Sequence, residues 1–81
     1  MEYERRYSKS ATKYLSTQTE TMRKRLKYAI QALPEGAVKS LNGRSGYRLT
    51  VGGFRVLFHR DDDAHIIWID DIGPRGDIYK K

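Results

Sequence analysis

The sequence predicts an α+β fold in which two helices pack on one face of a small, mostly antiparallel sheet. Two runs rich in β-branched and aromatic residues flank Gly52-Gly53, a pattern typical of a two-residue β-hairpin. An amphipathic stripe of helical period precedes this hairpin over residues 19–33, and a further apolar run follows it at residues 65–69. The expected order is therefore β-α-α-β-β-β, with the apolar faces buried between two layers.

The first two elements are expected to be short. Residues 2–7 alternate loosely, with Tyr3 and Tyr7 on one side, and predict a strand. Ser8 is the predicted N-cap of a helix that runs to about Thr17. The buried positions of this helix are expected to be Ala11, Tyr14 and Leu15.

The second helix is predicted over residues 19–33, because apolar residues recur there at helical spacing. The segment from Thr17 to Glu20 has the spacing of a capping box. Pro34 and Gly36 are expected to end the helix. The apolar stripe consists of Met22, Leu26, Ala29, Ile30 and Leu33. The cations that lie off this stripe are Arg23, Lys24, Arg25 and Lys27.

Residues 35–46 are expected to connect this helix to the hairpin, whose register follows by counting outward from its turn. The pairs on the core face are Val51 with Phe54, Leu49 with Val56, and Tyr47 with Phe58. On the other face Thr50 is opposite Arg55 and Arg48 is opposite Leu57. The two arginines are then diagonal neighbours, with β-carbons roughly 7–8 Å apart. This juxtaposition of like charges indicates an anionic ligand. The alternatives are an edge charge or a surface ion pair, for example with Asp70.

The third strand of this part is expected at residues 65–69. It is apolar on both faces, which predicts a position inside the sheet, and Gly73-Pro74 is expected to end it. Arg75 and Tyr79 follow directly, so both can fold back over the same sheet. Tyr79 has the chemistry to stack on a base or to donate a hydrogen bond. A frayed basic terminus is the alternative.

The composition predicts one domain, residues 1–81, near the lower size limit for a hydrophobic core. The absence of cysteine excludes disulfides and fits a reducing, cytoplasmic location. No apolar run reaches the length of a membrane span and no signal peptide is expected. The net charge is +6, and residues 1–33 carry eight basic against three acidic residues. A polyanionic partner is expected, although such a charge run is often only a solvated helix face.

The sequence gives little support for metal, paired-carboxylate or cofactor chemistry. His59 shares a face with Arg55, but its spacing from His65 matches no known ligand pattern, so no metal is expected. Asp70 and Asp71 should point to opposite faces of a strand, which argues against a paired-carboxylate mechanism. The sequence contains no phosphate loop, nucleophile elbow or dinucleotide fingerprint, and no cofactor is expected.

Three segments carry a resemblance to a known family. They are Leu41-Asn42-Gly43, the hairpin at residues 47–58 and Ile72-Gly73-Pro74-Arg75-Gly76-Asp77-Ile78-Tyr79. Together they resemble the RelE/ParE superfamily of bacterial toxins, whose order of elements matches the whole chain. The resemblance to the RelE branch implies the toxin of a type II toxin-antitoxin system. Such a toxin is a ribosome-dependent endoribonuclease that cuts mRNA in the A site by metal-independent attack of a ribose 2′-OH.

The resemblance also implies roles for four residues. By position, Arg55 would contact the scissile phosphate, and Arg75 would stabilise phosphate charge or the leaving group. Tyr79 would position the nucleotide, and Arg48 occupies a position where the RelE branch often has a basic residue. The chain departs from the family at Thr50, where some members carry a second lysine.

No lysine or glutamate is expected on the hairpin face, so the general base stays open between His59, Asp70 and Arg48. The implied partners are a cognate antitoxin, the ribosome and mRNA. The residues expected to bind ribosomal RNA are Arg23, Lys24, Lys27, Lys80 and Lys81.

Two alternatives remain. A ParE-like poison of DNA gyrase would be a binding module rather than an enzyme, and it would not need the set Arg55, Arg75 and Tyr79. A plain RNA-binding domain would explain the basic helix, but the hairpin face offers no exposed aromatic side chains for stacking.

Overall fold

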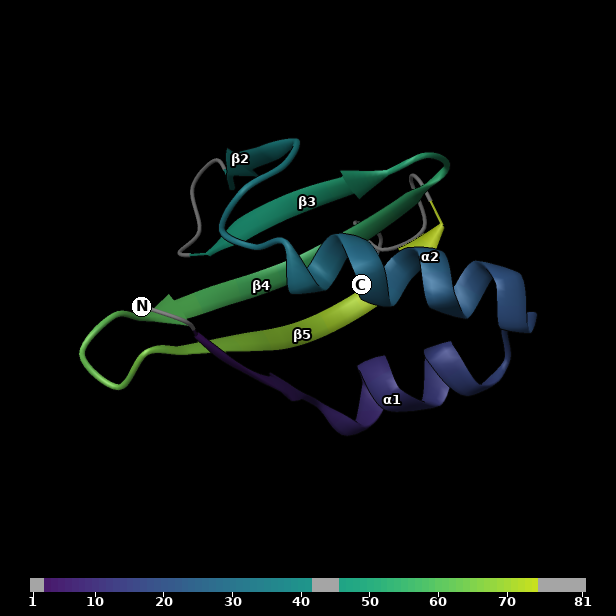
Figure 1. The fold of residues 1–81 in the computed structure, drawn as a ribbon, viewed down its shortest axis with the longest axis horizontal. Coiled ribbons are helices and arrows are strands. Elements are labelled where there is room, and N and C mark those ends of the chain that lie inside the picture. The colour runs from purple at the N-terminus through teal and green to yellow at the C-terminus, as the bar shows by residue number, and fades with distance from the viewer. Residues whose placement is uncertain (1–2, 42–45, 75–81) are drawn as a thin grey trace.

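The computed structural model describes residues 3–41 and 46–74 of the 81-residue chain. That part forms a five-stranded sheet and two helices (Figure 1). The elements are β1 (Glu4–Tyr7), α1 (Lys9–Ser16), α2 (Glu20–Gln31), β2 (Val38–Ser40), β3 (Tyr47–Val51), β4 (Phe54–Asp61) and β5 (Ile66–Pro74). Neither helix in these residues has the length and apolar character that crossing a membrane requires.

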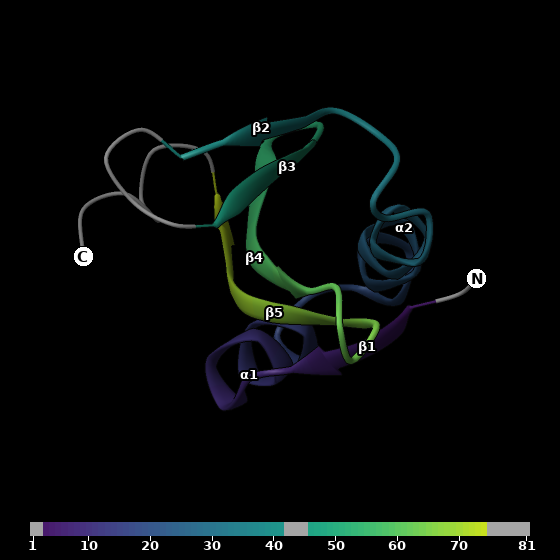
Figure 2. The ribbon, with the colours of Figure 1, turned by 90° about the vertical axis from the view of Figure 1, so that its left-hand side faces the viewer.

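The strands lie in the order β1-β5-β4-β3-β2, and only β1 runs parallel to its neighbour. The sheet is curved, with α2 on its concave side, and α1 packs against β5 where β1 has ended (Figure 2). Side chains of both helices join those of the sheet in one core cluster. The predicted α+β class is confirmed. The strand predicted at residues 65–69, which is β5, lies inside the sheet, as predicted.

Two predictions about strands were wrong. Residues 35–46 are not only a connection, because they contain β2, which pairs with β3 at the edge of the sheet. Three residues are too few to show an alternation, so only the pairing reveals this strand. The strand predicted at residues 65–69 is longer than expected, because β5 runs from Ile66 to Pro74. Gly73 and Pro74 pair with Arg55 and Phe54 and end the strand, as predicted.

Helix α1 begins as predicted. The Ser8 side-chain oxygen accepts a hydrogen bond from the Ala11 N–H at 3.0 Å, and its hydroxyl donates to the Asp70 carbonyl at 2.8 Å. The first contact caps the helix, and the second ties its start to β5. Ala11 and Leu15 are buried and Tyr14 is partly buried against the core, so the predicted inner face is confirmed.

Helix α2 has the predicted apolar stripe but not the predicted cap. Leu26, Ile30 and Leu33 are buried, while Met22 and Ala29 pack partly buried against the same core. The N-cap is Thr19, whose hydroxyl accepts from the Met22 N–H at 3.2 Å. Thr17 cannot open a capping box because it is the C-cap of α1, with its N–H bonded to the Tyr14 carbonyl at 3.1 Å.

Two arginines donate hydrogen bonds to the carbonyls at the carboxyl end of a helix other than their own. Arg5 of β1 donates to three carbonyls at the end of α2, at Ile30, Gln31 and Leu33, the last at 2.6 Å. Arg23 of α2 donates to the carbonyls of Leu15 (3.2 Å) and Gln18 (2.9 Å) at the end of α1. The last carbonyls of a helix lack intrahelical donors and carry partial negative charge, so a guanidinium satisfies both needs.

The hairpin has the predicted register at all five of its pairs. They are Tyr47 with Phe58, Arg48 with Leu57, Leu49 with Val56, Thr50 with Arg55, and Val51 with Phe54. Within the turn only Gly52 has a positive φ, of 57°, as in a type II′ turn. A β-carbon at Gly52 would also lie 3.2 Å from the Arg25 guanidinium of α2. The positive φ is the reason that the turn favours glycine at its first position, since the Arg25 side chain is flexible and could move.

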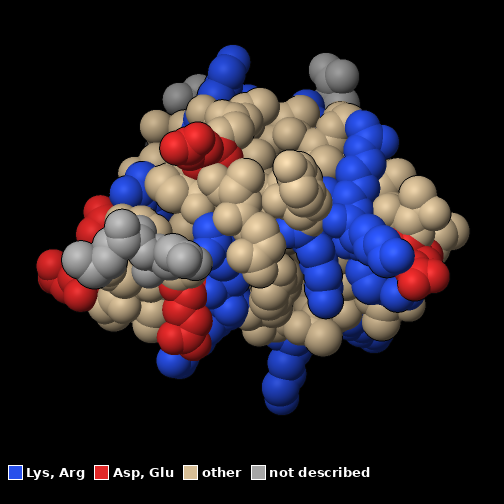
Figure 3. All heavy atoms as spheres, viewed as in Figure 1, with Lys and Arg blue, Asp and Glu red and all other residues tan. Residues whose placement is uncertain are grey.

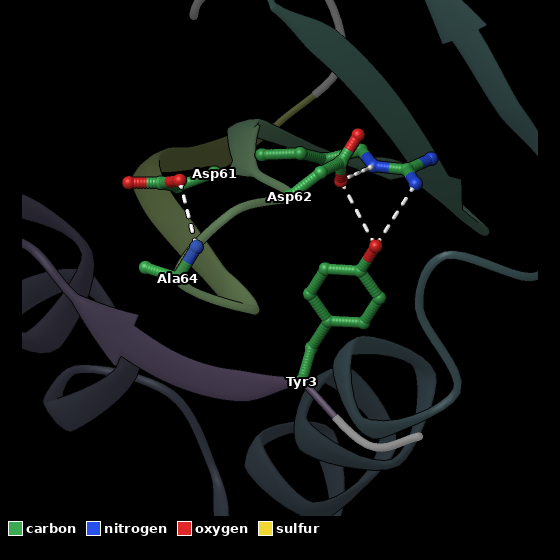
Figure 4. A network of polar contacts seen from close by, with 5 residues as sticks. Tyr3, Asp61, Asp62 and Ala64 are labelled. Carbon is green, nitrogen blue, oxygen red and sulfur yellow. Dashed lines mark hydrogen bonds and ion pairs between the residues drawn. The ribbon is translucent and has the colours of Figure 1, made fainter.

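The three acids predicted to form an exposed loop are exposed, but Asp61 is the last residue of β4, and Asp61 and Asp62 have defined partners (Figure 4). The Tyr3 hydroxyl donates to the Asp62 carboxylate at 2.9 Å, and Arg60 donates to the same oxygen at 3.1 Å. These two hydrogen bonds lower the pKa of Asp62 below its ordinary value. Asp61 accepts from the Ala64 N–H at 3.0 Å. The loop is thereby joined to the start of β1.

Replacement of Arg5 by methionine should lower the free energy of unfolding by about 1.5–3 kcal/mol, because carbonyls at the end of α2 lose a charged donor. Arg6→Met is the matched control. Arg6 lies next to Arg5, but its guanidinium is at the surface, where it pairs with Glu4 and lies 5.6 Å from the Trp68 ring centre, so its loss should change stability less. Urea unfolding followed by circular dichroism measures both. Equal midpoints for the two variants would contradict the structural role of Arg5.

Candidate nucleic-acid interface

The face of the sheet turned away from the helices carries the two arginines of the hairpin. Arg48 and Thr50 on β3 and Arg55 on β4 alternate with residues of the core face, as the pairing requires. Arg48 and Arg55 are thus diagonal neighbours on the open face, as predicted. The β5 residue opposite Arg55 is Gly73, which has no side chain to occupy the space beside it.

The guanidinium of Arg55 is only partly used within the described residues. Its Nη1 donates to the Phe54 carbonyl at 3.3 Å, and its Nε is buried without a hydrogen-bond partner in residues 3–41 and 46–74. A buried donor that lacks a partner costs about 1–3 kcal/mol. An anion that reaches this nitrogen would recover that cost, so Arg55 is suited to bind phosphate bidentately.

A third cation lies on the same face and was missed in the sequence. Lys39 of β2 is directly opposite Arg48 of β3, and its side chain is exposed. Residues paired in this way have β-carbons about 4.5–5.5 Å apart. The residue could not be selected beforehand because β2 itself was not predicted. Lys39, Arg48 and Arg55 therefore form a cationic patch across three neighbouring strands.

His59 lies on this open face at the end remote from the turn, as predicted. Its Nδ1 is 2.8 Å from the carboxylate of Asp70. Its ring stacks on Trp68 with centroids 6.1 Å apart and an interplanar angle of 11°. Arg6 of β1 places its guanidinium 5.6 Å from the Trp68 ring centre. The imidazole is therefore held by two neighbours on β5.

The position of Asp70 comes from a β-bulge. Leu57 pairs with Asp71 and Phe58 pairs with Ile69, so Asp70 has no opposite residue on β4. Simple alternation along β5 is interrupted here, and the two acids have separate partners. Asp70 binds His59, while Asp71 accepts from the Ser10 hydroxyl at 3.0 Å. The alternative in which Asp70 pairs with the hairpin arginines is wrong.

The predicted RNA-binding cations of α2 differ in their surroundings. Arg23 is partly buried and its guanidinium donates to backbone carbonyls at the end of α1, so less of its charge is available to an external RNA. Lys24 is exposed and lies 3.8 Å from Glu20, and Lys27 is exposed. Lys and Arg side chains gather over the helices in Figure 3. Tyr28 on α2 lies off the apolar stripe, and it is 81% exposed.

A cavity of about 350 Å³ opens between α1, α2 and β1, on the helical side of the molecule. Its lining residues are Tyr7, Thr12, Leu15, Ser16, Arg23 and Lys27. Burial raises the pKa of Tyr7 above its ordinary value, and Arg5 opposes this shift. The Tyr7 hydroxyl therefore stays neutral over a wide pH range. The cavity is separate from the cationic patch, which lies on the other side of the sheet.

Several predicted residues cannot be placed. Arg75, Tyr79, Lys80 and Lys81 lie outside the described residues, as do Asn42 and Gly43 of the family motif. Within the residues that are described, no group of three or more His, Asp or Glu side chains is arranged to hold a metal ion. The structure therefore brings Arg48, Arg55 and Lys39 together, with His59 on the same face.

Comparison with protein families gave no matching family model, and the curated proteins gave no significant sequence match. Solved structures do match. A chain of the archaeal RelE–RelB complex from Pyrococcus horikoshii OT3 has a TM-score of 0.76 and 23% identity, covering 95% of this chain and 99% of its own. A chain of the RelBE2 toxin–antitoxin complex from Mycobacterium tuberculosis has a TM-score of 0.80 and 17% identity, covering 93% and 100%.

The isolated RelE toxin of E. coli matches with a TM-score of 0.71 and 20% identity, covering 96% of this chain and 92% of its own. Each of these comparisons spans nearly the whole of both chains. They show that the chain has a RelE-like toxin fold, which the hairpin and the order of elements predicted.

Proposed function

We propose that this chain, which has the fold of the RelE toxins, is the toxin of a type II toxin–antitoxin system and a ribosome-dependent endoribonuclease. The observation that carries the proposal is the cationic patch of Lys39, Arg48 and Arg55 on the open face of the sheet. Arg55 adds a buried Nε without a partner in the described residues, which an RNA phosphate would satisfy.

The reaction that fits this patch is cleavage of RNA by its own ribose. The 2′-oxygen attacks the adjacent phosphorus, the bond to the 5′-oxygen breaks, and a 2′,3′-cyclic phosphate remains. Fixed guanidinium groups stabilise the charge that grows on the phosphate oxygens in the transition state. Arg48 and Arg55 supply this charge, and by resemblance Arg75 and Tyr79 complete the site.

Dependence on the ribosome follows from the position of the cations. The patch lies on the open face, whereas Lys24 and Lys27 belong to α2 on the opposite side of the sheet. A short RNA strand would not contact both surfaces, but a large RNA assembly that encloses the toxin would. Correct orientation of reactants contributes roughly 7–11 kcal/mol to such a reaction, and the ribosome would provide it.

An antitoxin is the proposed protein partner. Two of the matching structures, from P. horikoshii and M. tuberculosis, are complexes of a toxin with its antitoxin. For this chain, with its net charge of +6, the partner is expected to be an acidic segment that folds on binding and covers the cationic patch.

Arg55→Ala should abolish growth inhibition without lowering the melting temperature. Removal of the side chain also removes a buried donor without a partner, so stability should not fall. Arg55→Lys should keep part of the activity, because charge remains but the bidentate geometry is lost. Lys13→Ala on α1 is the control for loss of a surface cation. Full toxicity of Arg55→Ala would remove Arg55 from the phosphate site, and unfolding of that variant would make it structural.

Purified protein should leave free mRNA intact, with or without chelator, and should cut it in the A-site codon of programmed ribosomes. Primer extension locates the cut, and end-labelling identifies the cyclic phosphate. Lys24→Gln with Lys27→Gln should weaken ribosome binding and reduce its dependence on salt. Cleavage of free RNA at low protein concentration would contradict the dependence on ribosomes. Inhibited DNA supercoiling with intact mRNA would favour a gyrase poison instead.

Binding of the antitoxin should weaken steeply as salt rises from 50 to about 500 mM, because exposed opposite charges are screened. Calorimetric titration of toxin with the co-purified antitoxin measures this slope, and Lys39→Ala should reduce it. An affinity that does not change with salt would exclude the electrostatic account of this complex. Unaltered toxicity on co-expression would exclude that partner as the antitoxin.

A further inference from the structure

The proposed cleavage gives no role to His59, although neighbouring side chains hold its imidazole ring in place. It is held on both sides, by the Asp70 carboxylate at 2.8 Å and by the Trp68 ring at a stacking angle of 11°. Its side chain is nevertheless 51% exposed on the open face of the sheet. A fixed ring with an accessible edge is typical of an imidazole that exchanges protons with a bound molecule.

The contact with Asp70 decides which nitrogen is accessible to a ligand. An ionised carboxylate only accepts hydrogen bonds, so Nδ1 of His59 carries the hydrogen in this contact. In the neutral ring the lone pair then lies on Nε2. The β-bulge makes this possible, because it allows the extra residue Asp70 to reach His59 across the strands. The bulge thus sets the tautomer required of a proton acceptor.

His59 is also near the cations that would hold the phosphate. Arg48 is opposite Leu57, and His59 is two residues further along β4, so Arg48 and His59 are diagonal neighbours on one face. Diagonal β-carbons are roughly 7–8 Å apart, within reach of a long side chain. Arg55 is the diagonal neighbour of Arg48 on the other side. Arg48 therefore lies between Arg55 and His59.

We propose that His59 is the general base of the cleavage and that Asp70 is its positioning residue. The inference rests on the proposed function. Nε2 of His59 takes the proton of the 2′-OH, and the 2′-oxygen uses the freed electron pair to bond to phosphorus. The bond from phosphorus to the 5′-oxygen breaks, and that oxygen takes a proton from solvent. The products are a 2′,3′-cyclic phosphate, a 5′-OH and protonated His59, which returns its proton to water.

Other side chains on this face are less suited to the task. Arg48 stays protonated, and the Thr50 hydroxyl is a poor proton acceptor. Lys39 is exposed on the edge strand β2 and has no contact comparable to the one that holds His59 among the described residues. Within residues 3–41 and 46–74, the charged groups around His59 are Asp70 on β5, Arg48 on β3 and, beyond Trp68, Arg6 on β1. Asp70 is the group among them that directly contacts the ring.

The test is the single-turnover rate of mRNA cleavage on saturating programmed ribosomes, measured from pH 5 to 9. The wild-type rate should rise with pH, because only a neutral imidazole accepts the proton of the 2′-OH. His59→Gln should cleave about 10²–10⁴-fold more slowly, the usual contribution of a general base, and its rate should lose this rise. Added imidazole should restore part of the rate of His59→Ala, since removal of the half-exposed ring leaves room beside Trp68.

Three further variants separate the base from its surroundings. Asp70→Asn should show a smaller loss and keep the pH-dependent rise, because the ring is less well oriented but still present. Lys39→Met should weaken binding and keep the rise. His65→Asn is the matched control at the second histidine, where φ is 55° and asparagine is tolerated. Its rate should equal that of the wild type.

Each outcome separates the inference from the function on which it rests. Wild-type cleavage together with full activity of His59→Gln would overturn the base and leave the endoribonuclease intact. A slow His59→Gln that keeps the pH-dependent rise and is not rescued by imidazole would also overturn it, since His59 would then be structural. Loss of the rise in Lys39→Met would transfer the role to Lys39. Wild-type protein that binds ribosomes and leaves mRNA whole would overturn both.

Discussion

The register of β3 against β4 is the constraint on which the rest of the structure depends. The two-residue turn at Gly52-Gly53 sets it, and Gly52 has the positive φ that the turn requires. Because side chains alternate with a period of two, a slip of β3 by one residue against β4 would turn Arg48 into the core and expose Leu49. The apolar face on which α1 and α2 pack and the cationic patch therefore arise from the same turn.

Arginine has two different uses in this small domain. Arg5 and Arg23 bind the carbonyls at the carboxyl ends of α2 and α1, and so attach each helix to a neighbouring element. Arg48 and Arg55 lie on the open face instead, away from the helix ends. Net charge alone does not separate these uses, because a structural guanidinium and a ligand-binding one count equally. What the guanidinium contacts does separate them. At a helix end, backbone carbonyls accept its hydrogen bonds, so less of its charge is available to an external ligand.

The candidate site also depends on departures from regular strand geometry. The three-residue strand β2 adds Lys39 to the row of Arg48, and the bulge in β5 brings Asp70 to His59. The local sequence predicts a connecting loop where β2 lies, and a regularly alternating strand where the bulge lies. The proposed chemistry uses both: the edge strand adds phosphate-binding charge, and the bulge orients a proton acceptor.

Sequence alone determined the parts of this protein that local periodicity encodes. The hairpin register, the inner faces of both helices, the Ser8 cap and the shared face of Arg48, Arg55 and His59 follow from spacings of two and of three to four residues. Tertiary structure decided what depends on partners farther along the chain: β2, the bulge at Asp70 and the engagement of Arg23 with α1. Such features depend on which carbonyls, carboxylates and strand edges meet after the chain has folded. A local pattern contains no information about those distant neighbours, which is why only the folded chain shows them.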